Sequence, residues 1–99
     1  MMVVYKKPDG GAVVLVKGAP EMVLNVCTSV HSKKSGKTSN LNEKRIKKLD
    51  KANADMGSKG LRVLGLAYRE LSSVELSTLS VEEMESNLTL ISLVGMFFI

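Results

Sequence analysis

The stretch VVLVKGAPEMVLNVC, residues 13–27, constrains the fold of this chain more than any other segment. The apolar run over residues 13–16 predicts a buried strand, and the strand ends on a cation, Lys17, followed by Gly18. Pro20 then stands where a first helical position is expected, because the N–H that proline lacks would be unpaired there in any case. The stretch therefore predicts a strand that ends on a lysine and leads almost directly into a helix.

Other segments supply partners for this strand. Residues 3–5 favour a strand, and the turn Pro8-Asp9-Gly10-Gly11 predicts a β-hairpin with residues 12–17. Residues 61–68 are apolar on both faces apart from Arg62, which is typical of a central strand covered on two sides. A helix is predicted over 19–27, followed by a polar loop over 28–39. A second helix is predicted from a capping box at Asn40–Glu43 to Gly57 or Gly60. The rest of the chain predicts an acidic connection over 70–86, with one helical turn at 81–84, and a last strand over 88–98.

This order of elements predicts an α+β fold, in which helices pack on an antiparallel β-sheet. Ninety-nine residues are enough for one small domain or for part of one. Only four strands are predicted, which indicates a sheet that lacks an edge. We therefore expect residues 1–99 to form a single partial domain.

Composition disfavours several classes of function. Cys27 and His31 are the only residues of their types, so neither a disulfide within the chain nor a metal site is expected. The lysine-rich stretch 33–51 holds no aromatic residue, which disfavours nucleic-acid binding. The apolar stretch 88–99 is shorter than the roughly 18 residues of a membrane-spanning helix, so we expect a soluble chain without membrane contact. No catalytic triad or other catalytic motif is present.

Lys17 and Arg62 occupy matching places, at the end of one predicted strand and the start of another. A buried cation without a partner is costly, so each of them needs an anion. Gly18 has no side chain and would let such a partner approach the backbone closely. Two alternatives stay open, namely ion pairs with glutamates such as Glu21 or Glu70, and a bound anionic ligand. Spacing alone favours the ion pairs.

Three blocks of the sequence resemble the nucleotide-binding domain of P-type cation-transporting ATPases. KGAPEMVLNVC at 17–27 resembles the lysine-glycine-alanine-proline-glutamate segment of that family, and GLRVLGLAYRE at 60–70 resembles its second signature. NLTLISLVGM at 87–96 is similar to the strand that leads toward the phosphorylation domain. With the hairpin before them, the blocks follow the family order over nearly the whole chain, closest to the calcium and sodium/potassium branch.

The resemblance implies ATP as the ligand, with magnesium in the parent enzyme. Lys17 matches the lysine that lines the ATP pocket, and Gly18 would let the nucleotide lie close. Arg62 matches the arginine that reaches the phosphates, and Met2 matches a methionine beside the adenine. The implied partners are the phosphorylation and actuator domains of the parent pump, on the cytoplasmic side of a membrane.

The chain departs from the family pattern in several places. The family's phenylalanine that stacks on adenine would precede Met1, and the Asp-Lys-Thr-Gly-Thr motif with the phosphorylated aspartate is absent. Residues 97–99 stand where the family continues into its hinge. The resemblance therefore implies a truncated nucleotide-binding domain that binds ATP weakly and, alone, has no catalytic residue and no activity. The alternative is a non-catalytic structural or interaction module with the same fold and no nucleotide.

Overall fold

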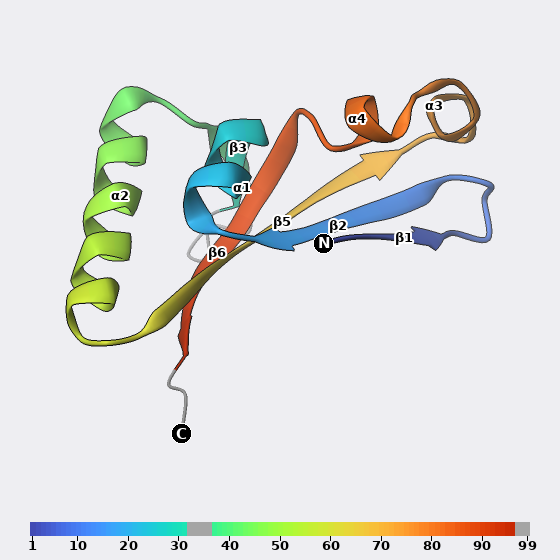
Figure 1. Cartoon of the computed structure of the whole chain (residues 1–99). Helices are drawn as coiled ribbons and strands as arrows, with labels where there is room; N and C mark the ends of the chain where they lie inside the picture. The colour runs from blue at the N-terminus through green and yellow to red at the C-terminus, as the bar shows by residue number, and fades with distance from the viewer. Residues whose placement is uncertain (32–36, 97–99) are drawn as a thin grey trace.

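A computed structural model describes residues 1–31 and 37–96 of the chain (Figure 1). It confirms the α+β class, with helices packed on one sheet. The elements in chain order are β1 (Met2–Lys6), β2 (Ala12–Gly18), α1 (Pro20–Val26), β3 (Cys27–His31), β4 (Thr38–Asn40), α2 (Glu43–Ser58), β5 (Arg62–Leu71), α3 (Ser73–Thr78), α4 (Val81–Met84) and β6 (Leu88–Met96).

The sheet has six described strands in the order β1-β2-β5-β6-β3-β4. The predicted hairpin is confirmed, since β1 and β2 pair antiparallel from Met2↔Val16 to Lys6↔Ala12. Its turn is closed by the Asp9 side chain, whose Oδ1 accepts the N–H of Gly11 at 2.9 Å. Every other described pairing is antiparallel too, except that β3 runs parallel to β6.

The loop predicted over residues 28–39 is wrong at both of its ends, where β3 and β4 lie. Neither strand has the alternating apolar pattern of a half-buried strand, so no local signal in the sequence indicates them. They form because β6 offers an unpaired edge to β3, and β3 in turn offers its other edge to β4. Residues 32–36, which belong to the same predicted loop, lie outside the described residues.

Helix α2 begins two residues later than predicted. Its N-cap is Asn42, whose Oδ1 accepts the N–H of Arg45 at 2.9 Å, whereas Asn40 is the last residue of β4. At the other end, Gly60 has a φ of 78° and donates its N–H to the carbonyl of Gly57 at 3.0 Å. A glycine in this left-handed conformation is a common helix stop, so the end was predictable and the start was displaced by strand pairing.

The acidic connection contains two short helices, of which only α4 was predicted. Each begins with a capping box: Ser72 and Glu75 cap α3, and Ser80 and Glu83 cap α4. In both boxes the serine oxygen accepts the glutamate N–H, and the glutamate carboxylate accepts the serine N–H. The same serine-x-x-glutamate spacing was therefore the available signal for α3.

The two sides of the sheet differ in how they are covered. The side chains of Val14 and Ala67 point toward the helices, as do those of the strand residues on the same side of the sheet. We call this side the helix face. It carries all the buried strand residues, and Val23 of α1 and Leu49 of α2 pack against it. The buried hydrophobic residues are Ala12, Val14, Val23, Ala67, Leu71, Leu88 and Leu90.

We call the opposite side, to which the side chains of Leu15 and Leu66 point, the open face. None of its strand residues is buried, although most of them are apolar. β5 is central, as predicted, because it lies between β2 and β6. We also predicted that β5 is covered on both of its faces, but residues 1–31 and 37–96 form no layer over the open face. No helix in these ranges has the length and apolar character needed to cross a membrane.

Candidate functional site

Lys17 lies near the end of β2, opposite Leu66 of β5. Its backbone is held on the other side by the residue that precedes β1, because its N–H donates to the carbonyl of Met1 at 2.9 Å. The side chain is exposed, and so is that of Arg62. The expectation that these two cations are buried is wrong, because they lie on the open face or at its end, where no second layer covers the sheet.

The ion-pair alternative for Lys17 is not found among the described residues. Its ammonium group makes no ion pair with Glu21 or Glu70. The Glu21 carboxylate instead accepts a hydrogen bond from the Asn53 amide at 3.3 Å. Glu70 pairs with Val13, toward the far end of the strands from Lys17. The lysine therefore presents its charge to solvent, where an anionic ligand could reach it.

The strand register brings Lys17 and Arg62 to the same end and the same face of the sheet. β2 and β5 pair without interruption from Ala12↔Leu71 to Gly18↔Gly65. Directly opposite residues share a face, and side chains alternate along each strand. Arg62 lies four residues before Leu66, the partner of Lys17, so its position belongs to the open face as well. Four residues correspond to about 13 Å along a strand.

The other two predicted site residues lie on the helix face. Met2 pairs with Val16, so its side chain points away from the face that carries Lys17. Gly18 lies opposite Gly65, and a Cβ added to it would be 3.7 Å from a methyl group of Val23. The structure thus divides the four residues: Lys17 and Arg62 share the open face, and Gly18 and Met2 share the helix face.

Two hollows adjoin Lys17, one on each face. The helix-side hollow, of about 240 Å³, is lined by Lys17, Gly18 and Met22 but also by the carboxylate side chain of Glu85. In the open-face groove, of about 310 Å³, Lys17 has the only charged side chain among the lining residues. Anion binding is therefore favoured on the open face, where no acid lines the hollow.

The open-face groove was not predicted from the sequence. It is lined mainly by apolar side chains at alternate positions of β1, β2 and β5, together with Tyr5. Ile91 of β6 also lines it, and this residue is skipped in the pairing of β5 with β6, where Leu66 pairs with Ser92 and Ala67 with Leu90. Such a bulge redirects a side chain. The alternating apolar residues of the hairpin were a signal for this surface.

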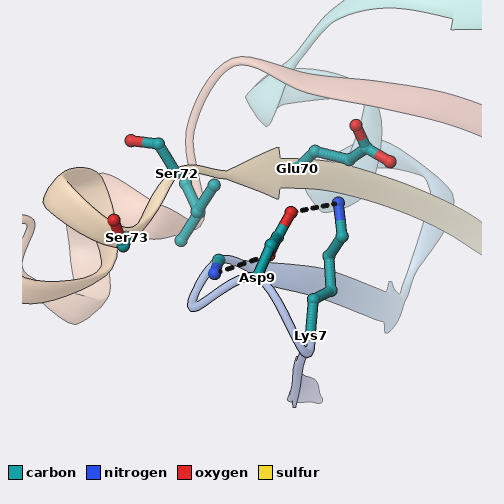
Figure 2. A pocket seen from close by; sticks show the side chains of 7 residues that line it. Lys7, Asp9, Glu70, Ser72 and Ser73 are labelled. Carbon is teal, nitrogen blue, oxygen red and sulfur yellow. Dashed lines mark hydrogen bonds and ion pairs between the residues drawn. The ribbon is translucent and has the colours of Figure 1, made fainter.

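A third hollow, of about 360 Å³, lies at the other end of β5 (Figure 2). Its lining includes Lys7, Asp9 and Glu70, and Lys7 Nζ lies 3.9 Å from Asp9 Oδ2. Because two carboxylates lie beside one ammonium group, the net charge of this hollow is unfavourable for binding a polyanion. No group of three or more histidine, cysteine, aspartate or glutamate side chains in the described ranges could hold a metal ion.

Residues 1–97 match the family model described as P-type ATPase, cytoplasmic domain N. The chain belongs to this family. The predicted resemblance is thereby confirmed, and the family description places the N domain on the cytoplasmic side in P-type pumps.

Relatives of this N domain include calcium pumps from several kingdoms. Calcium-transporting ATPase 1 of Saccharomyces cerevisiae is 38% identical over 88 residues, which cover 89% of the chain and 9% of that protein. Plasma membrane calcium-transporting ATPase 4 of Bos taurus is 33% identical over 95 residues, covering 96% of the chain and 8% of the relative. An endoplasmic reticulum-type calcium-transporting ATPase 2 of Arabidopsis thaliana is 34% identical, covering 97% and 10%. The chain thus spans about a tenth of the length of these relatives.

Proposed function

We propose that this N domain binds ATP at the Lys17 end of its open face. The observation that carries the proposal is the β2–β5 register, which aligns Lys17 and Arg62 on one face. Two cations that face a triphosphate can share its charge, and arginine can bind phosphate oxygens in a bidentate manner. Family membership supports the same role, because the three relatives are named as ATPases.

In this proposal the chain binds and orients the nucleotide and does not perform the chemistry. Lys17 and Arg62 hold the phosphates, and the γ-phosphate is presented to an aspartate in another domain of a P-type pump. Phosphoryl transfer depends chiefly on positioning and on charge stabilisation, so a binding domain contributes by placing its nucleotide. Magnesium accompanies ATP in such reactions, but we assign no described side chain to it, because none of them forms a metal-binding cluster.

The first test is Lys17→Ala, followed by NMR titration of the labelled chain with ATP. Loss of a charge-assisted contact costs about 1.5 to 3 kcal/mol, so the affinity should fall roughly ten- to a hundredfold. Lys6→Ala is the matched control, because Lys6 is also an exposed lysine near a strand end but pairs with Ala12, at the other end of the hairpin. Unchanged ATP affinity in the Lys17 variant would contradict the proposal.

Arg62→Ala tests whether the arginine acts on the phosphates. We expect this variant to lose preference for ATP over adenosine, measured by competition among ATP, AMP and adenosine. An equal loss for all three ligands would instead indicate a packing role for Arg62. The alternative function, a structural module without nucleotide, would be supported if the wild-type chain showed no ATP-dependent chemical shift changes at millimolar concentration.

A further inference from the structure

The outer edge of β1 has no neighbouring strand in the part of the chain that the structure describes. β1 pairs only with β2 and forms one border of the sheet (Figure 1). The strand at the other border, β4, has three residues, all of them polar. β1 has five residues, and every one except the last is apolar or aromatic. Edge strands that resist pairing with another chain are short, charged or interrupted, so β1 is the border that is open to such pairing.

The hydrogen bonds at the start of β1 show which of its backbone groups face outward. Met1 and Lys17 each donate to the carbonyl of the other, at 2.6 and 2.9 Å, so the backbone groups of Met1 face β2. In an antiparallel pair these groups alternate, and every second residue turns them away from its partner strand. The residues of β1 with outward N–H and C=O groups are therefore Met2, Val4 and Lys6.

We propose that this edge binds a second copy of the chain, with the two β1 strands antiparallel and a twofold axis at Val4. In this register Val4 lies opposite Val4 of the second copy, and Met2 lies opposite Lys6 of the second copy. These pairs use every outward N–H and C=O group of both strands, whereas moving the axis to a neighbouring residue would leave one outward residue of each strand unpaired. The edge is thus complementary to itself in one register, and the inference is independent of nucleotide binding.

The same register brings compatible side chains together. On the open face Tyr5 lies opposite Val3 of the second copy, and an aromatic residue opposite a β-branched one is a favourable cross-strand pair. The exposed fractions of Tyr5 and Val4 are 57% and 37%, so both side chains have surface left to bury. Lys6, the only charged residue of β1, lies about 13 Å along the strands from Lys6 of the second copy, beyond the screening length of about 8 Å at physiological salt. Repulsion between the two lysines is therefore weak.

Sedimentation equilibrium from micromolar to millimolar concentration tests the association. We expect the molar mass to rise with concentration toward twice the 10.7 kDa of the chain. Val4→Pro removes the central outward N–H, which β2 does not use, and proline is compatible with an edge strand. Loss of the two hydrogen bonds at the axis should raise the dissociation constant about five- to a hundredfold. Val4→Thr is the matched control, because it keeps the N–H and a β-branched side chain and should associate like the wild type.

Disulfide formation tests the register without a proline. Chains with Val3→Cys and chains with Tyr5→Cys, both also carrying Cys27→Ala, are oxidised mixed and separately. The mixture should form a covalent dimer, because the Cα atoms of these opposite residues would be about 4.5 Å apart. Neither chain alone should do so, because like residues would be about 8 Å apart. A chain that stays monomeric at millimolar concentration, a dimer that Val4→Pro leaves unchanged, or cross-linking that does not require mixing would overturn the proposal.

Discussion

Gly65 is a point at which α1 approaches the sheet closely, and it gives a sharp test of the packing. A Cβ at this position would lie 3.0 Å from Cβ of Val23, and 3.2 and 3.3 Å from its two γ-carbons. Val23 is 1% exposed and belongs to the main core, so it cannot move without opening that core. Overpacking of this kind costs about 1 to 3 kcal/mol, so Gly65→Ala should lower the free energy of unfolding by about 2 kcal/mol.

The assay is urea unfolding followed by far-UV circular dichroism, since the chain has no tryptophan to report on unfolding. A loss of about 2 kcal/mol corresponds to a melting temperature lower by roughly 8 to 16 °C in a domain of this size. Val23→Ala removes the two γ-carbons that the new methyl group meets, so the double variant should cost at least about 0.5 kcal/mol less than the sum of the single variants.

Gly57→Ala is the control for the loss of a glycine as such. An added Cβ at Gly57 meets nothing within 4 Å, and the residue lies within α2. Alanine is the better helix former, so this variant should gain up to about 1 kcal/mol. The packing argument is refuted if Gly65→Ala is as stable as the wild type, or if its cost adds independently to that of Val23→Ala.

Three further predictions concern the helix face and its edge. Arg69→Lys should destabilise the domain by about 1.5 to 3 kcal/mol in urea unfolding, because the guanidinium donates to the carbonyls of Glu83 and Ser86 at 3.0 and 2.9 Å and a lysine lacks that fork. Hydrogen bonds from Ser72, backbone first, together with Arg69, hold the pKa of Glu75 below its ordinary value of 4.5. This carboxylate therefore stabilises the fold above its unfolded-state pKa, and the contribution is lost as pH falls through the folded-state pKa; Glu75→Gln should flatten the stability profile below about pH 4.5. Burial raises the pKa of the Cys27 thiol to about 11, so its alkylation at pH 8 should be far slower than that of free cysteine and reach the ordinary rate in urea.

The parts of the fold that the sequence predicted are those with local causes. The hairpin follows from turn residues that set their own dihedral angles, and α1 from a proline at its first position, Pro20. The strands at one edge of the sheet were missed because neither β3 nor β4 has an alternating apolar pattern. β3 depends on pairing with β6, and β4 depends on pairing with β3. Their existence is a property of the assembled sheet and could not be read from residues 28–40 alone.

The strand ends on which Lys17 and Arg62 lie were predictable, and the surroundings of the two side chains were not. The sequence predicts that Lys17 ends one strand and that Arg62 starts another, and the antiparallel pairing of β2 with β5 places these two ends together. The prediction that Lys17 and Arg62 are buried was wrong because a strand pattern shows which residues are apolar but not which face another layer will cover. Apolar residues on both faces of β5 were interpreted as two covers, whereas one face forms an exposed groove, and Tyr5 in that groove was not considered.

Gly18 and its neighbours also take part in the packing of α1 against the sheet. Gly18 and Gly65 lie directly opposite each other on the helix face, and Val23 packs over both of them. The missing side chain of Gly65 lets α1 lie close to the sheet, whereas a Cβ at Gly18 would make an ordinary van der Waals contact with Val23, at 3.7 Å. The chain turns from Lys17 into the helix within three residues. Because side chains alternate, the position that faces α1 is necessarily next to one that faces the groove. A slip of one residue in the pairing would exchange the two, turning Lys17 toward the core and away from the groove. The packing of Val23 over Gly65 therefore fixes the register in which Gly18 faces α1 and Lys17 lies on the open face.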